Sequence, residues 1–303
     1  MKLKPYTTAP FLAALCYLMT VCAGYILAGL DTTANGYFYA FGGIQLAAYL
    51  LPLVLYALLF GGIPFRRMRF AMPTAVSIPL QILLAVILLV GTSLISMLLE
   101  RVGIVSSESA GGTGIGTPSI VAIAVAAILP AALEEIIFRG VIMSSFEPCG
   151  VSPAIIGSSL LFAFAHMSFE KLPLYFFAGV ILAFSAYVSR SIFVPIFLHA
   201  VYNIASLCLG DYLSGIAAHL ESFSLLFILL VFTLWILVLI ALSEGSRVYG
   251  VYAERELDSS YTPAKITRTE RATGNVSVYF SVPFLLATLI FIAIVIFKMQ
   301  DIA

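Results

Sequence analysis

Charged residues are scarce in this chain of 303 residues: Asp, Glu, Lys and Arg make up 10% of it, against 62% hydrophobic residues. Because soluble domains carry about 25% charged residues, this composition excludes an ordinary water-soluble protein and indicates a polytopic membrane protein. The 15 basic and 15 acidic residues cancel, so no basic excess points to nucleic acid. We therefore expect the lipid bilayer as a partner, and no nucleic acid.

Cysteine and histidine are also rare. The four cysteines, at positions 16, 22, 149 and 208, show no paired spacing of a metal site, so we interpret them as small buried hydrophobic residues.

The glycine-rich stretch at 105–118 lacks Gly-Lys-Ser/Thr, which excludes a phosphate-binding loop of that type. No serine stands in a Gly-x-Ser-x-Gly context, which disfavours that class of serine hydrolase.

Long apolar runs, in contrast, recur along the whole chain. About 20 apolar residues cross the hydrocarbon core of a bilayer. We place membrane helices at Pro10–Leu30, Tyr37–Phe60, Val76–Leu99, Ser119–Val141, Pro153–His166, Leu172–Val188, Ile192–Leu209, Phe223–Leu242 and Val278–Phe297. The sequence thus predicts an all-α fold, a polytopic membrane helix bundle of about eight or nine transmembrane helices. We expect it to form a single integral membrane domain over residues 1–303.

Basic residues in the connecting segments predict the orientation, because cytoplasmic loops carry an excess of Lys and Arg. Lys2 and Lys4 precede the first run, and Arg66, Arg67 and Arg69 follow the second. Further basic residues lie in the polar stretch 243–277. We expect a multi-pass protein of the cell membrane with a cytoplasmic N-terminus and a cytoplasmic loop at 243–277.

One apolar run ends in two adjacent glutamates. Glu134 and Glu135 lie near the end of Ser119–Val141, followed by Arg139, and ionisable groups at membrane depth are usually functional. Glu135 and Arg139 are four residues apart, so they share one helix face and can neutralise each other. Glu134 is rotated by roughly 100° about the helix axis. It lacks that partner, which makes it a candidate general base.

Few other strongly polar side chains fall inside the apolar runs. His166 ends the fifth run, and His199 and Asn203 lie four residues apart on one face of the seventh. A lone polar residue in a membrane helix is often only an interhelical hydrogen-bond partner. Burying several without mutual satisfaction is costly, so we expect all three to converge with Glu134. The third histidine, His219, lies in a predicted external loop.

Converging Glu, His, His and Asn side chains favour hydrolysis. Glu134 and His166 would orient and deprotonate a water, while His199 and Asn203 would stabilise the oxyanion that forms. Two histidines and a glutamate are also the ligands of several zinc hydrolases, although His-Glu-x-x-His is absent. An intramembrane Glu/His relay would instead suit a proton-coupled transporter, although no inverted repeat supports it.

Three short motifs, in this order on successive apolar runs, resemble those of the CAAX protease and bacteriocin-processing family (CPBP or Abi family) of intramembrane endopeptidases. They are Glu134-Glu135-x-x-x-Arg139, Phe162-x-x-x-His166 and His199-x-x-x-Asn203. The resemblance covers 119–209, the protease core of the family. It implies that Glu134 is the catalytic glutamate, with His166 as its partner in activating water. His199 and Asn203 would stabilise the oxyanion, and Glu135 and Arg139 would support the site.

The resemblance further implies an enzyme that cleaves a peptide or protein substrate in or near the membrane, of the prenylated or bacteriocin type. We favour the glutamate mechanism without a cofactor, and a zinc-dependent version of the same protease stays open. The alternative from another class is a catalytically silent immunity or scaffold protein that binds a peptide in the same cavity.

The predicted topology contains a conflict. It places Glu134 toward the cytoplasmic leaflet and His166, at the far end of the next run, toward the opposite leaflet. Convergence therefore requires a re-entrant or strongly tilted segment, which is allowed where backbone lines a water-filled cavity.

Overall fold

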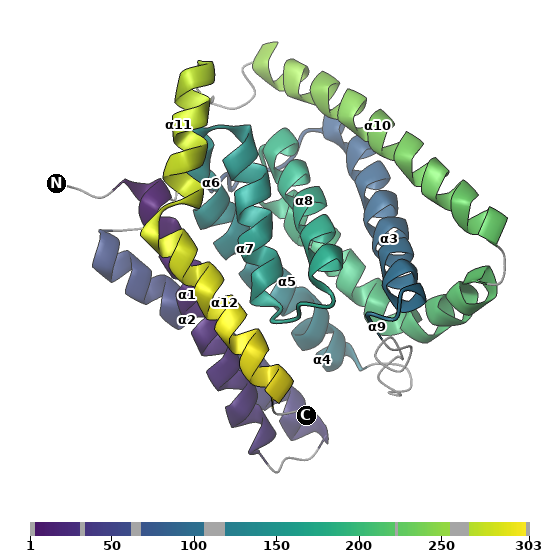
Figure 1. Ribbon diagram of the computed structural model, residues 1–303, viewed down its shortest axis with the longest axis horizontal. Helices are drawn as coiled ribbons and strands as arrows, with labels where there is room; N and C mark the ends of the chain where they lie inside the picture. The colour runs from purple at the N-terminus through teal and green to yellow at the C-terminus, as the bar shows by residue number, and fades with distance from the viewer. Residues whose placement is uncertain are drawn as a thin grey trace.

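The computed structural model describes residues 4–30, 34–61, 68–105, 119–221, 224–254 and 267–300. Every regular element in these ranges is a helix (Figure 1). The predicted all-α fold is therefore confirmed.

Long helices form most of the molecule. They are α1 (Pro5–Ala28), α2 (Ala34–Phe60), α3 (Ile78–Arg101), α8 (Leu172–Ser189), α9 (Phe193–Glu221), α10 (Ser224–Glu254), α11 (Arg268–Tyr279) and α12 (Val282–Gln300). Shorter pieces are η2 (Ala75–Ser77), α4 (Ile120–Ile123), η4 (Ala124–Ile128), α5 (Leu129–Glu135), η5 (Ile136–Met143), α6 (Ser144–Phe146), η6 (Glu147–Cys149), η7 (Pro153–Gly157) and α7 (Ser158–Ala165).

Among the described residues, seven helical segments are long and apolar enough to cross a membrane. The number becomes eight if α11 and α12, which meet at 45°, count as one span. The chain is thus a multi-pass membrane protein, at the lower end of the predicted eight or nine spans. The difference arises at the fifth run, because the apolar helix Pro153–Ala165 is shorter than a full span.

The helix that carries the two glutamates extends beyond its predicted end. The run expected at Ser119–Val141 forms one helical segment from Ile120 to Cys149. Ser144 and Ser145 do not interrupt it, because their hydroxyls donate to the carbonyls of Gly140 and Val141 in the preceding turn. Glu134 therefore lies near the middle of this segment rather than at its C-terminal end. This position, with the short α7, removes the conflict in the predicted topology.

Much of the stretch 243–277, predicted as a loop, is helical. Helix α10 continues to Glu254, and α11 begins at Arg268, whereas residues 255–266 lie outside the described residues. The polar residues of α10 are compatible with a helix because Arg247 pairs with Glu244 at 2.8 Å. Helix α11 starts with a capping box between Thr267 and Glu270.

The glutamate-bearing segment lies at the centre of the bundle. Helix α1 packs against α2 and α12 on one side of the bundle. On the other side, α3 packs against α8, α9 and α10. Helices α5, α7 and α8 lie between α1 and α3 (Figure 1). Large, fully buried side chains pack in this centre, among them Tyr17, Phe138 and Phe162. The core thus fixes the helices that carry the candidate site residues.

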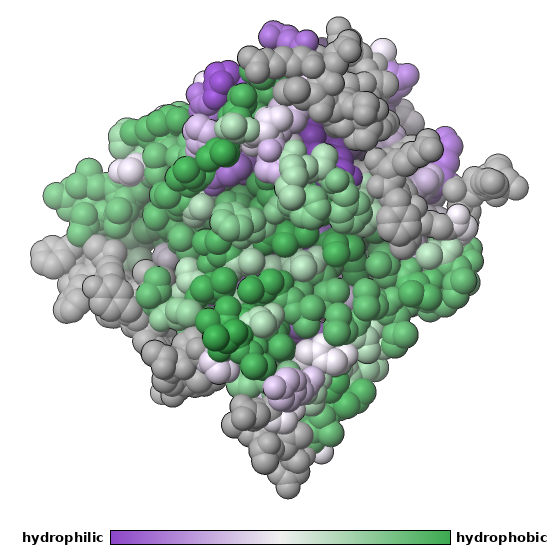
Figure 2. All heavy atoms as spheres, turned by 180° about the vertical axis from the view of Figure 1, so that it is seen from behind, coloured by the Kyte–Doolittle hydropathy of each residue, from purple (hydrophilic) through white to green (hydrophobic). Residues whose placement is uncertain are grey.

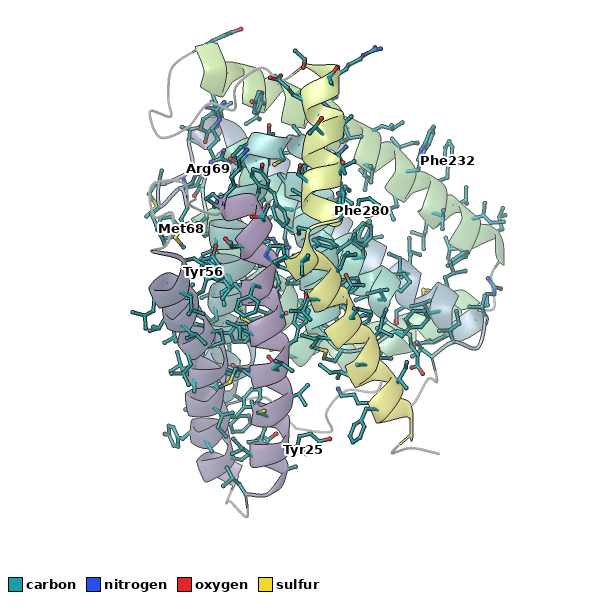
Figure 3. All side chains as sticks on the ribbon, turned by 60° about the vertical axis from the view of Figure 1, so that its left-hand side comes forward. Tyr25, Tyr56, Met68, Arg69, Phe232 and Phe280 are labelled. Atoms are coloured by element: carbon teal, nitrogen blue, oxygen red, sulfur yellow. The ribbon has the colours of Figure 1, made fainter. Side chains whose placement is uncertain are left out.

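The exterior is largely apolar. Hydrophobic residues cover most of the face in Figure 2, and hydrophilic residues gather mainly at one end, near α11. Large apolar side chains such as Phe232 point outward, as Figure 3 shows. Cys22 and Cys208 are exposed too, so the prediction that the cysteines are buried holds for Cys16 and Cys149 only. Such a surface suits contact with lipid chains.

Candidate active site

A fully buried ion pair joins Glu135 and Arg139 of the first motif. The guanidinium Nη1 of Arg139 lies 2.9 Å from Oε1 of Glu135, as their spacing of four residues predicts. Nη2 of Arg139 donates to the carbonyl of Gly179 on α8 at 3.0 Å. The pair therefore ties the π-helical segment η5 to α8.

The same carboxylate oxygen also binds a histidine. Oε1 of Glu135 lies 2.9 Å from Nδ1 of His199, which projects from α9. An ionised carboxylate only accepts hydrogen bonds, so Nδ1 of His199 is the donor. Glu135 thus orients His199 as well as Arg139. Sequence spacing alone does not predict the contact with His199.

Glu134 occupies a separate, buried position. Its Oε1 accepts a hydrogen bond from the hydroxyl of Tyr49 on α2 at 3.0 Å. Its Oε2 has no hydrogen-bond partner among the described residues. Glu134 forms no ion pair among the described residues, although Arg139 lies within electrostatic range of it. It is held by a tyrosine that the sequence did not single out. An aromatic residue in an apolar run carries no signal of such a role.

His166 caps the C-terminal end of α7. Its Nδ1 lies 3.0 Å from the carbonyl oxygen of Phe162, and a carbonyl can only accept, so Nδ1 donates. In a neutral ring, Nε2 then keeps its lone pair and can accept a proton. The ring also stacks on Tyr175 of α8, with centroids 3.9 Å apart, which fixes its plane.

Phe162 connects the parts of the site. Its ring centroid lies 4.9 Å from that of His166 and 5.7 Å from that of His199. The guanidinium carbon of Arg139 lies 4.3 Å from the same centroid, within range of a cation–π interaction. One buried aromatic ring therefore sets the spacing of both histidines relative to the ion pair.

Asn203 lies one turn after His199 on α9. Its Nδ2 donates to the carbonyl of Ala127 in η4 at 3.1 Å. An amide nitrogen carries two hydrogens, so a second N–H remains for another acceptor. This bond fixes the side chain against the segment that leads to Glu134.

Three of the four predicted catalytic residues line one cavity. A cavity of about 180 Å³ is lined by Leu88, Phe162, His166, Leu174, Tyr175, Ala178, Leu182, His199, Tyr202 and Asn203. Glu134 does not line it, but lies within electrostatic range of His166. The structure thus brings His166, His199 and Asn203 together and places Glu134 beside them.

The donor set does not fit a metal ion as it stands. Among the residues that the structure describes, no three or more His, Cys, Asp or Glu side chains cluster in a way that could hold one. The carboxylate of Glu135, which lies nearest to His199, is already bound to Arg139. We therefore derive no chemical step through a metal.

The comparison with known families points to the same segment. Residues 116–205 match the Rce1-like family model, whose description is Type II CAAX prenyl endopeptidase Rce1-like. This range contains all three motifs, so the resemblance drawn from them is confirmed, and the match supports an intramembrane protease of the CAAX type. No curated protein and no solved structure matches the chain.

Proposed function

We propose that this protein is an intramembrane endopeptidase in which Glu134 and His166 activate water and His199 and Asn203 stabilise the oxyanion. The observation that carries the proposal is the meeting of His166, His199 and Asn203 in one cavity, with Glu134 within electrostatic range of His166. These residues come from α5, α7 and α9, which only the fold brings together.

The hydrolysis needs a base, a water and two hydrogen-bond donors. Oε2 of Glu134 and Nε2 of His166 are the free acceptors that would hold the water. As the water attacks the peptide carbonyl carbon, Glu134 takes its proton and a C–O bond forms. The tetrahedral intermediate then collapses, the C–N bond breaks, and the same proton passes to the leaving amine.

The two donors act on the oxygen that becomes negative. Asn203 has one N–H to spare after its bond to Ala127. His199 already uses Nδ1–H on Glu135, so only its doubly protonated ring has Nε2–H available as a donor. The role therefore requires an imidazolium, whose charge Glu135 partly balances. A charged donor would stabilise an oxyanion more strongly than a neutral one.

The substrate would be a peptide or protein within or near the bilayer, of the prenylated or bacteriocin type. The lining of the cavity is mainly apolar and aromatic, which suits a hydrophobic segment. We propose a location in the cell membrane with the N-terminus cytoplasmic. Arg69 packs on Tyr187 and Arg190 on Tyr249, and these two rings stack on each other. Two arginines at one end of the bundle support this orientation.

The first test replaces the proposed base. Glu134→Gln should lower turnover of a quenched-fluorescent peptide in liposomes by at least about 100-fold, because general base catalysis contributes that much. The matched control is Glu244→Gln, which removes a carboxylate on α10, far from the cavity. Undiminished turnover by the Glu134 variant, with native melting, would refute the proposal.

Two alternatives make different predictions in the same assay. The position of Glu134 outside the cavity lining favours a silent immunity or scaffold protein that binds a peptide. Such a protein would bind the probe and cleave none of it. In the zinc-dependent version, exhaustive chelation would abolish turnover and added zinc would restore it.

A further inference from the structure

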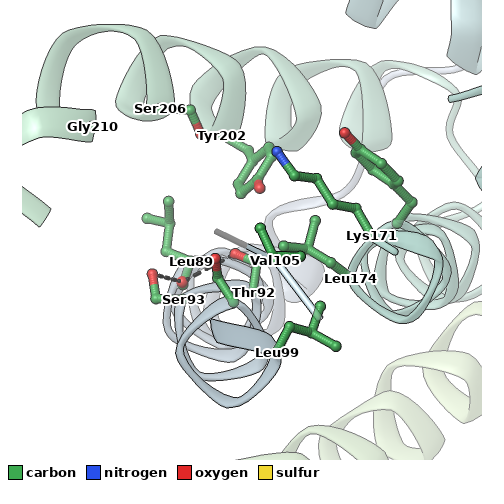
Figure 4. Close-up of a pocket in the computed structure, with 12 residues that line it drawn as sticks. Leu89, Thr92, Ser93, Leu99, Val105, Lys171, Leu174, Tyr202, Ser206 and Gly210 are labelled. Carbon is green, nitrogen blue, oxygen red and sulfur yellow. Dashed lines mark hydrogen bonds between the residues drawn. The ribbon is translucent and has the colours of Figure 1, made fainter. Parts of the chain in front are cut away.

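A second cavity adjoins the one that contains the histidines. Its volume is about 290 Å³, and it shares Leu174, Tyr175 and Tyr202 with the first cavity. Its other walls come from α3, the start of α8 and the middle of α9 (Figure 4). A chain bound at the histidines could therefore continue into it past the two tyrosines.

Hydroxyl groups concentrate on one wall of this second cavity. Thr92, Ser93 and Ser96 line it from α3, and Ser206 faces them from α9 (Figure 4). The hydroxyls of Thr92 and Ser93 donate to helix carbonyls at 2.7 and 2.8 Å, so their free lone pairs act as acceptors. Acceptors on an otherwise apolar helix suit the N–H groups of an extended peptide.

One charged side chain reaches across the cavity. Among the described residues that line it, Lys171 is the one with a formal charge, and its side chain extends toward Tyr202 in Figure 4. Lys171 is also the N-cap residue of α8, so the positive end of that helix dipole adds to the field. The cavity combines acceptors for N–H groups with a positive charge.

We propose that the second cavity binds a carboxylate of the peptide substrate, with Lys171 as the residue that recognises it. The inference rests on the proposed function for the position of the cleaved bond, which would lie at His199 and Asn203. The carboxylate would come from the C-terminus of the peptide or from an acidic side chain near the cleaved bond. In either case Lys171 determines specificity and takes no part in bond cleavage.

The test uses two matched pairs of quenched-fluorescent apolar peptides. One pair ends in a free carboxylate or in an amide, and the other carries Glu or Gln beside the cleaved bond. The native protein should prefer one carboxylate form by about 10-fold in kcat/KM, and the pair that shows the preference identifies the source. Lys171→Met should reduce that ratio to near one, and Lys171→Arg should retain it.

A binding assay separates this inference from the proposed function. Fluorescence anisotropy of the same peptides on the Glu134→Gln protein measures affinity without cleavage, so the result does not depend on catalysis. The expected result is again about 10-fold weaker binding of the preferred carboxylate peptide after Lys171→Met. Lys298→Met, at the distant end of α12, is the matched control and should leave the ratio unchanged.

Three outcomes would overturn the inference. The native protein could show equal kcat/KM and affinity for the charged and neutral peptides. Lys171→Met could lower all of them equally, which would indicate a structural role. It could also act only in vesicles that contain phosphatidylglycerol, and not in pure phosphatidylcholine, which would assign the cavity to a lipid phosphate.

Discussion

At the scale of single residues, one carboxylate oxygen accepts hydrogen bonds from two side chains. Oε1 of Glu135 binds both Arg139 and His199 at 2.9 Å. The first contact follows from a spacing of four residues and could be predicted. The second joins residues 64 positions apart on different helices. The periodicity of a single helix cannot predict such a contact. The bond from Tyr49 to Glu134 was missed for the same reason.

Removing one partner of this buried pair should be costly. Arg139→Met leaves the charge of Glu135 less compensated, so we expect a loss of about 3–5 kcal/mol of stability. Thermal melting in detergent measures the change. Arg247→Met, which breaks the exposed pair with Glu244, should cost less than about 1 kcal/mol.

The double variant Glu135→Leu/Arg139→Met sharpens this prediction. It removes both charges, so melting should recover toward the native value. Turnover should stay low, because His199 has then lost the acceptor that orients it. Full recovery of turnover with stability would limit the pair to a structural role.

Tyr49 should act as a positioning residue for Glu134. Tyr49→Phe removes one buried hydrogen bond, which costs about 0.5–1.5 kcal/mol, and leaves the carboxylate free to rotate. We expect kcat to fall about 10-fold with KM unchanged, because Tyr49 does not line the cavity in which the substrate would bind. Steady-state kinetics in liposomes measure both constants.

A control for Tyr49 lies on the same helix. Tyr56→Phe removes a similar hydroxyl, which bonds Thr8 at 3.0 Å, away from the site. It should change melting to a similar degree and leave kcat unchanged. Tyr49→Phe should also add no further loss in the Glu134→Gln background. An equal fall in kcat for both tyrosine variants would argue against positioning.

At the scale of elements, the site depends on how closely α7 approaches α8. A Cβ atom at Gly179 would lie 3.1 Å from Phe162 Cδ1 and 3.2 Å from the Cα of Ser159. The glycine therefore lets the two backbones pack closely. Because His166 ends α7, this distance also sets where its ring lies.

Gly179→Ala should push these helices apart. We expect a loss of about 1–3 kcal/mol of stability, the usual cost of overpacking, together with reduced turnover from displacement of His166. Melting and kinetics on one preparation test both effects. Gly43→Ala, where the added Cβ meets nothing within 4 Å, should be neutral or slightly stabilising. Native behaviour of the Gly179 variant would show that α7 and α8 can adjust.

The limits of the predicted elements have a local cause. Hydropathy located the apolar runs, but the fourth was ended at Val141 because polar residues follow it. In the structure, Ser144 and Ser145 satisfy their hydroxyls on the preceding turn, so the helix continues. Hydrogen bonds of this kind are not visible in a hydropathy pattern. Because the helix continues past Val141, Glu134 lies in the middle of the span and not at its end.

At the scale of the whole molecule, composition and hydropathy were sufficient for the fold class. A chain with 10% charged residues has to place its few ionisable groups inside or at the ends of the bundle. Composition does not determine which helices meet. The site depends on that arrangement, since α2, α5, α7, α8 and α9 each contribute at least one contact to it.

The shared oxygen of Glu135 has a consequence for how this protein can change. The oxygen that anchors the ion pair also orients His199, so under the proposed function stability and catalysis depend on the same atom. Replacement of the ion pair by aliphatic residues would also remove the acceptor of His199, and with it the catalysis that we propose. Gains have to come from helices remote from this junction.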